Sequence, residues 1–375
     1  MERTSLAAPG VDPALRDAVA RRLRDDLELG AAGADRPVLR RAVARALAAE
    51  GVVVAPATWA RMVRDLVDDL AGLGPLEALL RDPAVTDVMV NGADEVHVER
   101  GGALTRAPVR FDDDAHLERT LRRVLGPTGA RLDRAHPYAD AVLEGGVRLH
   151  AILPPLARRP TLTLRRVSAV VPTWEELLAA GAVDPPLQQL LTRAVEQRRN
   201  VVVCGQAGVG KTTLLARLLD AVGGDRVVVI EDAPELDEPA EHSVHLRVRP
   251  PGPAGDSGVD VATLVRNALR MRPDRIVIGE VRGHEVADML MAMNTGHAGS
   301  MTTVHANGAE DALVRLEGMA LLAGVPLAAA RAQVGTALDL IVAMGRDQDG
   351  ARRVAAVCEV LSRDDAAPAT RRVWP

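Results

Sequence analysis

The chain has 375 residues, 47% of them hydrophobic and 26% charged, which is typical of a globular protein with two or three domains. Its formal net charge of -5 excludes a global electrostatic attraction to nucleic acid or anionic lipid, while a local basic face remains open. The two cysteines, Cys204 and Cys358, lie in apolar runs. They are expected to be buried thiols in a reducing compartment, and neither a disulfide nor a zinc site is expected.

Residues 1–73 are predicted to form an N-terminal helical region. In "PALRDAVARRLRDDLEL" and "TWARMVRDLVDDLAGL", apolar residues recur at helical spacing among arginine and aspartate. The charged faces of these helices are expected to be solvated, with a docking role as the alternative. No signal peptide is expected, because no basic segment followed by an apolar one opens the chain.

Residues 74–171 are predicted to form a small α+β domain. The short runs "VTDVMVNG", "EVHVERGG" and "LTRAPVRF" have strand character, and "DDDAHLERTLRRVLG" has helical spacing. The prolines in "ILPPLARRP" and "VVPTW" then indicate a hinge before the next domain.

Residues 172–375 are predicted to form an α/β domain. Apolar runs, namely "NVVVC", "RVVVI", "RIVIG", "SMTTV" and "DLIVAM", alternate with helical patterns, which predicts a mostly parallel sheet covered on both faces. The uncharged stretch 289–309 carries polar residues throughout and is not expected to span a membrane. Since ligands bind at the carboxyl ends of parallel strands, the residues that follow each run are the candidates for a site.

The segment after "NVVVC" is a complete phosphate-binding loop, GxxxxGK(S/T), followed by a helical sequence. Lys211, the only lysine in the chain, is expected to contact the β- and γ-phosphates of ATP, and the Thr212 hydroxyl is expected to bind Mg²⁺. A compact ammonium enters a tight loop, whereas a planar guanidinium is bulkier and prefers forked contacts. The residues expected to bind the nucleotide are Gly205, Gln206, Ala207, Gly208, Val209, Gly210, Lys211, Thr212 and Thr213.

Acidic residues and a histidine follow three further runs. The run "RVVVI" is followed by Glu231, Asp232 and Glu235. These residues are candidates to hold Mg²⁺ through water or to activate the attacking water. An ordinary acidic turn without a catalytic role is an equal alternative. Glu280 closes "RIVIG" as in a Walker B strand, although glycine stands at position 279 where aspartate is commoner. His305 follows "SMTTV", where it is placed to sense the γ-phosphate or to contact a neighbour, with a surface or hydrogen-bonded histidine as the commoner alternative. All four strand ends are expected to converge on one edge of the sheet.

The motifs together resemble one family. "GLGPLEALLRDPAVTDVMVNG", "GQAGVGKTTLL", "VIEDAPEL" and "LVRNALRMRPDRIVIGEVRGHEVADMLMAMNTGHAGSMTTVHAN" are similar to the type II/type IV secretion ATPase superfamily, and most to its CpaF/TadA pilus-assembly branch. The resemblance implies a RecA-like P-loop domain, a preceding α+β domain and a hexameric ring. It also implies that Glu235 is the favoured base, that Glu280 is the Walker B glutamate and that His305 is the centre of a histidine box. The expected Mg²⁺ ligands are Thr212 and Glu280, with Glu231 and Asp232 further out.

The same resemblance implies that arginines of the α+β domain reach the phosphates. The matching segments "GGVRLHAILPPL" and "LTLRRVS" offer Arg148, Arg165 and Arg166, each with a surface arginine as the alternative. This chain reads "LEGGVR" where relatives often have Pro-Asp-Gly, which puts the turn before Arg148 in doubt.

The functional hypothesis is a Mg-ATP-hydrolysing homohexamer that powers assembly of a Flp/Tad-type pilus or a related secretion machine. Its expected partners are inner-membrane pilus or secretion platform proteins, through which it contacts the membrane peripherally, on the cytoplasmic face. No stable nucleic-acid partner is expected, because aromatic residues for a stacking channel are only 1% of the chain. The alternatives are a conjugation-linked or nucleic-acid-translocating ATPase and a slow, ATP-sensing assembly scaffold.

Overall fold

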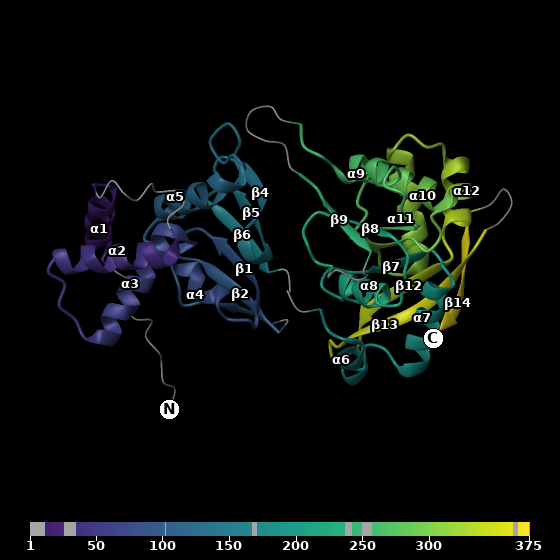
Figure 1. The fold of residues 1–375 in the computed structure, drawn as a ribbon, viewed down its shortest axis with the longest axis horizontal. Helices are drawn as coiled ribbons and strands as arrows, with labels where there is room; N and C mark the ends of the chain where they lie inside the picture. Colours follow the sequence, from purple (N-terminus) through teal and green to yellow (C-terminus); the bar gives the residue numbers. More distant parts are fainter. Residues whose placement is uncertain are drawn as a thin grey trace. The chain divides into compact units, whose positions relative to one another are not determined.

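The computed structural model describes residues 12–25, 35–101, 103–166, 171–236, 242–249, 257–362 and 367–374. These residues form two compact units, an N-terminal unit that ends at residue 166 and a C-terminal unit that begins at residue 171 (Figure 1). Within these ranges, no helix has the length and apolar character that crossing a membrane requires. The three domain limits at residues 73, 171 and 375 stay a prediction.

Three amphipathic helices at the start of the N-terminal unit share a core of their own. Val19, Leu47 and Leu66 are fully buried where the helices meet. Two of the helices have proline in the first turn, where the missing N–H costs no helical hydrogen bond. The helices are α1 (Pro13–Asp25), α2 (Arg36–Ala49) and α3 (Pro56–Ala71).

A six-stranded antiparallel sheet, in the order β3-β2-β1-β6-β5-β4, forms the rest of the described N-terminal unit. Its strands are β1 (Val85–Asn91), β2 (Val96–Arg100), β3 (Ala103–Arg106), β4 (Tyr138–Val142), β5 (Val147–Ile152) and β6 (Thr161–Arg166). Helix α5 (Asp114–Leu125) begins at the N-cap Asp113, whose side chain accepts the His116 N–H, and buries Leu117 and Leu121 in the core of the sheet. Short helical turns complete the unit: η1 (Gly74–Leu76), α4 (Glu77–Leu80), η2 (Gly126–Thr128) and η3 (Glu144–Gly146).

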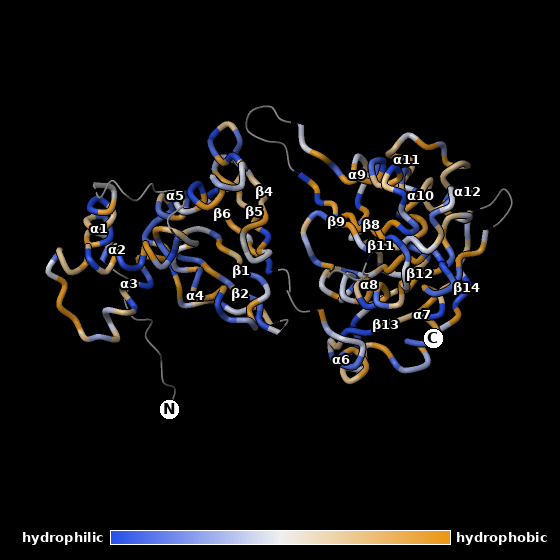
Figure 2. The backbone as a smooth tube through the Cα atoms, viewed as in Figure 1, coloured by the Kyte–Doolittle hydropathy of each residue, from blue (hydrophilic) through white to orange (hydrophobic). Residues whose placement is uncertain are grey.

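The C-terminal unit is built on an eight-stranded sheet in the order β14-β13-β12-β7-β11-β10-β8-β9. The strands from β12 to β9 are parallel, as the buried apolar runs predict, and Figure 2 colours the middle ones hydrophobic. The antiparallel strands β13 and β14 at one edge are an addition that the sequence analysis missed. The bounds are β7 (Val201–Gly205), β8 (Val227–Glu231), β9 (Ser243–Arg247), β10 (Arg275–Ile278), β11 (Met301–His305), β12 (Leu340–Arg346), β13 (Arg352–Leu361) and β14 (Ala369–Trp374).

Helices cover both faces of this sheet. Successive residues of a strand point to opposite sides, so alternate residues of β7 pack against different sets of helices. Val202 and Cys204 pack with the helices of one face, which are α9 (Val261–Ala268), α10 (Glu285–Asn294), α11 (Ala309–Leu322) and α12 (Leu327–Ala337). Val201 and Val203 pack with the other face, formed by α6 (Trp174–Ala179), α7 (Pro185–Glu196) and α8 (Lys211–Leu219). Cys204 and Cys358 are both free and buried, as expected, and burial raises the pKa of the Cys204 thiol to about 12.

Candidate nucleotide site

The phosphate loop connects the buried strand β7 to helix α8. A Cβ atom at Gly205 would lie 2.7 Å from the Met344 carbonyl oxygen, so only glycine fits this close approach. Gly210 has a φ of 98°, a left-handed conformation that glycine adopts without strain, and it is the N-cap of α8. The loop therefore presents the N-terminus of a helix to its ligand, which is a favourable place for phosphate.

Lys211 lies at the first position of α8 and is only 7% exposed. Its Nζ donates a hydrogen bond to the Gln206 carbonyl oxygen at 2.9 Å, so the ammonium folds back over the loop. Thr212 and Thr213 follow in the first turn and are half-buried. The structure thus brings the lysine and both threonines to the phosphate loop that the sequence predicts.

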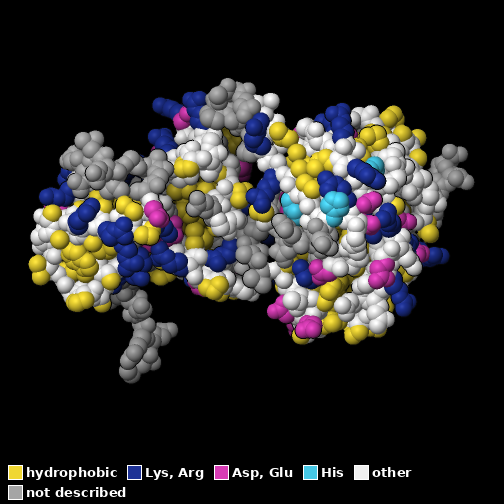
Figure 3. All heavy atoms as spheres, in the orientation of Figure 1, with side chains coloured by type: hydrophobic (Ala, Val, Ile, Leu, Met, Phe, Trp, Pro, Cys, Tyr) yellow, Lys and Arg dark blue, Asp and Glu magenta, His cyan; other side chains and the backbone are white. Residues whose placement is uncertain are grey.

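Three neighbouring strands end at the same edge of the sheet as β7. β11 lies directly beside β7, with His305 opposite Gly205 in the ladder. β10 and then β8 follow in the sheet, so that Glu280 and Glu231 come to this edge as well. The convergence that the strand pattern predicts is therefore found in the fold. On the face drawn in Figure 3, histidine side chains of this unit lie beside basic ones.

His305 connects the lysine of the loop to the Walker B carboxylate. Its Nδ1 lies 3.4 Å from Lys211 Nζ, and its Nε2 lies 2.8 Å from Glu280 Oε1. Burial, with the nearby positive charges, lowers the pKa of His305. With its proton on Nε2, a neutral imidazole can accept from the ammonium at Nδ1. The approach of Nε2 to Glu280 Oε1 lacks hydrogen-bond geometry in the described part of the chain. A surface depression of about 220 Å³ opens beside it, lined by His305, Ala306, Asn307, Asp311, Val314 and Arg315.

Glu280 is held from a second side by Arg282. The Glu280 side chain is 17% exposed, and its Oε2 accepts a hydrogen bond from Arg282 Nε at 2.8 Å. Arg282 Nη1 also lies 3.6 Å from Asp232 Oδ2 on the acidic turn. The guanidinium therefore joins two of the predicted acidic residues, a connection that the sequence pattern did not reveal.

The acidic turn after β8 is organised by its first residue. Glu231 is buried, with 4% exposure, and its Oε1 accepts the backbone N–H groups of Glu235 and Leu236 at 2.9 Å each. Asp232 and Glu235 lie further along the turn and are less buried. The structure thus places Glu231, Asp232 and Glu235 together at the edge where β8 ends.

The three predicted arginines belong to the sheet of the N-terminal unit. Arg148 of β5 lies opposite Arg165 of β6 in the ladder. Arg165 is about half exposed, with Nε 4.0 Å from Asp87 Oδ1. Arg166 instead donates to the carbonyl oxygens of Leu80 and, at 3.2 Å, Asp82, so it ties a turn to the sheet. Their roles toward a phosphate stay a prediction.

The sequence analysis missed Arg346, which contacts the phosphate loop from the opposite side. β12 lies next to β7, and Arg346 at its end donates from Nη2 to the Gly208 carbonyl oxygen at 3.2 Å. Its Nη1 donates to the Gly350 carbonyl oxygen at 2.9 Å, which links the loop to the β12–β13 turn. The sequence feature that could have identified Arg346 is its position, because Arg346 follows the apolar run "LIVAMG" just as Glu280 follows "RIVIG".

A family model described as "Type II/IV secretion system protein" matches residues 69–371. The chain belongs to the type II/IV secretion system protein family. It is 42% identical to a putative conjugal transfer protein of Mycobacterium tuberculosis over 320 residues, which cover 83% of this chain and 91% of that protein. It is 34% identical to the type IV secretion system protein VirB11 of Brucella suis, with 66% of this chain and 76% of that protein covered.

The fold agrees with this membership of the type II/IV secretion family. The solved structure of the pilus retraction motor PilT with bound ADP matches with a TM-score of 0.53 at 21% identity, over 75% of this chain and 81% of that chain. At this identity the likeness shows the fold alone. The predicted RecA-like α/β fold with a preceding α+β part is confirmed, and membership of the family supports ATPase activity in general.

Proposed function

We propose that this chain is a Mg-ATP-hydrolysing motor subunit of a homohexamer that powers assembly of a Flp/Tad-type pilus or a related type II/IV secretion machine. The observation that carries the proposal is the contact chain of Lys211, His305 and Glu280 across three adjacent strand ends. It joins a phosphate-binding lysine to a Walker B carboxylate through a neutral imidazole. In the proposal, this connection couples phosphate occupancy at Lys211 to the carboxylate Glu280.

The phosphates of ATP would bind the N–H groups of the loop and the ammonium of Lys211, which in this structure donates to the Gln206 carbonyl oxygen. The donor set at the loop suits Mg²⁺, because the Thr212 hydroxyl and the Glu280 carboxylate are the oxygen ligands that this cation prefers. Asp232 lies further out and would act through water. When bound, Mg²⁺ would neutralise charge on the phosphates.

Glu235 is the proposed general base, and Glu280 is the alternative. Oε2 of Glu280 accepts a hydrogen bond from Arg282, and Oε1 lies 2.8 Å from His305 Nε2 without hydrogen-bond geometry in the described part of the chain. A carboxylate held by a guanidinium is suited to binding a cation or positioning water, and Glu235 on the acidic turn is the proposed proton acceptor. The attack on the γ-phosphoryl group is in line, and catalysis is mostly positioning and charge neutralisation.

Arg148 and Arg165 are proposed to complete the site from the N-terminal unit of the same or a neighbouring subunit. This assignment is supported by their positions in the sheet, because the two arginines lie opposite each other on the neighbouring strands β5 and β6. Guanidinium groups stabilise charge on a transferred phosphoryl group. Arg166 is assigned a supporting role instead, because its guanidinium binds the carbonyl oxygens of a turn.

Conjugation-linked transport is a second candidate, which the name of the M. tuberculosis relative, a putative conjugal transfer protein, favours. The two functions share the motor and differ in what it serves: a pilus platform at the inner face of the cytoplasmic membrane, or a conjugal transfer machine. The ATPase rate should be measured with and without single-stranded DNA. A rate that DNA leaves unchanged supports the pilus motor, and a rate that DNA raises several-fold supports the second candidate.

The proposal of ATP hydrolysis itself is tested by Lys211→Ala. Loss of the ammonium should abolish turnover, because no other lysine exists to replace it. A Lys211→Ala protein that hydrolyses ATP at the wild-type rate would overturn the proposal. Addition of EDTA should stop the wild-type reaction, and Mg²⁺ should restore it.

A further inference from the structure

Glu231 is a buried carboxylate whose Oε1 accepts two hydrogen bonds from backbone N–H groups. Oε1 accepts the N–H groups of Glu235 and Leu236, each at 2.9 Å, and only 4% of the residue is exposed. Hydrogen bonds from N–H groups to an ionised carboxylate are about twice as strong as neutral ones. The Glu231 side chain therefore fixes the backbone position of Glu235.

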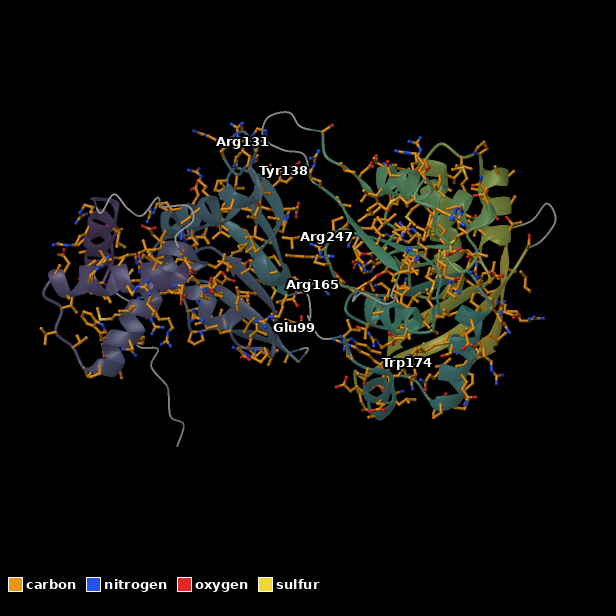
Figure 4. All side chains as sticks on the ribbon, viewed as in Figure 1. Glu99, Arg131, Tyr138, Arg165, Trp174 and Arg247 are labelled. Atoms are coloured by element: carbon orange, nitrogen blue, oxygen red, sulfur yellow. The ribbon has the colours of Figure 1, made fainter. Side chains whose placement is uncertain are left out.

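The second oxygen of Glu231 faces strand β9. Oε2 lies 3.6 Å from Nδ1 of His245, whose other ring nitrogen is buried without a hydrogen-bond partner in the described part of the chain. The Glu231 carbonyl oxygen accepts the N–H of Val248, the residue directly after β9, at 3.1 Å. Arg247, labelled in Figure 4, is the ladder partner of Glu231.

Gly279 lies beside this carboxylate. A Cβ atom at residue 279 would lie 3.4 Å from Glu231 Cγ, which is van der Waals contact. Gly279 is fixed in turn, since Thr303 Oγ1 donates to its carbonyl oxygen at 2.7 Å. The glycine that departs from the common Walker B pattern thus lies against Glu231.

We infer that Glu231, supported by His245, is a positioning residue that holds Glu235 in the geometry needed to activate water. The inference rests on the proposed function, in which Glu235 is the base. A general base acts only within hydrogen-bond reach of the proton it removes, and small displacements lower the rate strongly. The two N–H bonds to Oε1 and the approach of His245 to Oε2 favour this role for Glu231 over Mg²⁺ binding.

The test compares Glu231→Ala and Glu231→Gln by steady-state ATPase kinetics and by binding of a fluorescent ATP analogue. Glu231→Ala should lower kcat at least about 10-fold while the KM for ATP and the analogue Kd stay within about 2-fold. Glu231→Gln keeps an acceptor oxygen and should retain most of the kcat. His245→Ala should lower kcat in the same direction by less.

The matched control is Glu317→Ala, since Glu317 is a buried carboxylate of α11 in the same unit, paired with Arg331. It controls for loss of stability and should leave kcat unchanged. The inference is overturned when Glu231→Ala matches this control, or when its KM rises in step with the loss of kcat.

Glu235→Gln separates the inference from the proposed function. If Glu235→Gln is inactive and Glu231→Ala is active, the inference alone fails. If Glu235→Gln keeps the wild-type kcat, the base assignment fails and the inference with it. The double variant Glu231→Ala/Glu235→Gln should be no slower than Glu235→Gln alone, because residues that act as one unit are not additive.

Discussion

His305 Nε2 lies 2.8 Å from Glu280 Oε1, and the opposite ring nitrogen of His305 lies 3.4 Å from Lys211 Nζ. One imidazole therefore contacts both the residue expected to hold the phosphates and the carboxylate expected to bind Mg²⁺. Burial lowers the pKa of this ring, which favours its neutral form at neutral pH.

Replacing His305 by alanine should lower kcat about 10-fold or more, because the link between Lys211 and Glu280 is lost. His305→Gln keeps a donor and an acceptor and should recover part of the rate. Steady-state kinetics measures both variants, with His284→Gln, an exposed histidine beside Asp260, as the control. Equal rates for His305→Ala and the control would contradict a role for the contact.

Lys211→Arg should be nearly as inactive as Lys211→Ala although it keeps the charge. The side chain of Lys211 is almost buried and makes its contacts through a single nitrogen, which a planar guanidinium cannot reproduce in the same space. Binding of a fluorescent ATP analogue and turnover measure the effect. Wild-type turnover by Lys211→Arg would show that the ammonium itself is not required.

Arg346→Ala should raise the KM for ATP several-fold and change kcat less, because Arg346 braces the phosphate loop through the Gly208 carbonyl oxygen. Arg346→Lys, which has one donor group in place of a fork, should recover only part of the affinity. Arg353→Ala on the neighbouring strand β13 serves as the control. A KM for Arg346→Ala equal to that of the control would show that the loop keeps its shape without this contact.

The pH dependence of stability in the N-terminal unit should reflect two opposed groups. Burial raises the pKa of Asp69 to about 6, so its contribution to stability decreases as the pH rises from 4 to 6. Burial lowers the pKa of His116 to about 4, so its contribution increases over the same range, because protonation favours the unfolded chain there. The contributions of Asp69 and His116 should therefore largely offset each other between pH 4 and 6.

His116→Gln should remove one of the two effects and expose the other. Its free energy of unfolding should fall as the pH rises from 4 to 6, by on the order of 2 kcal/mol. Urea unfolding at several pH values measures this, in a variant with Trp59 of α3 as its single tryptophan. A flat profile for His116→Gln would show that Asp69 does not titrate in this range.

Much of the fold followed from the sequence because the strands of a parallel sheet are continuous apolar runs. "NVVVC", "RVVVI" and "RIVIG" became β7, β8 and β10, and their order placed Lys211, Glu231 and Glu280 on one edge. Strand β13 was missed because its sequence, two adjacent arginines followed by "VAAVCEVL", favours neither period clearly. Contacts between strands, such as those of Arg346 and Arg282, depend on strand order, which the linear pattern does not specify.

The roles of single residues were less accessible than their positions. The sequence "EDAPEL" does not distinguish Glu231 from Glu235. In the structure, Glu231 is buried and accepts the Glu235 N–H, so it stabilises the turn, while Glu235 remains the candidate base. Arg148, Arg165 and Arg166 likewise came as one group from the resemblance. The structure divides them, since the guanidinium of Arg166 is occupied by carbonyl oxygens of its own unit.

The most direct measurement is the ATPase rate per chain as a function of protein concentration, with the molecular mass determined with and without ATP. Lys211→Ala and Glu280→Gln serve as inactive controls. A ring motor predicts a specific activity that rises as hexamers form and that is absent in Lys211→Ala. A concentration-independent rate from a monomer would contradict the ring mechanism while leaving the phosphate loop in place.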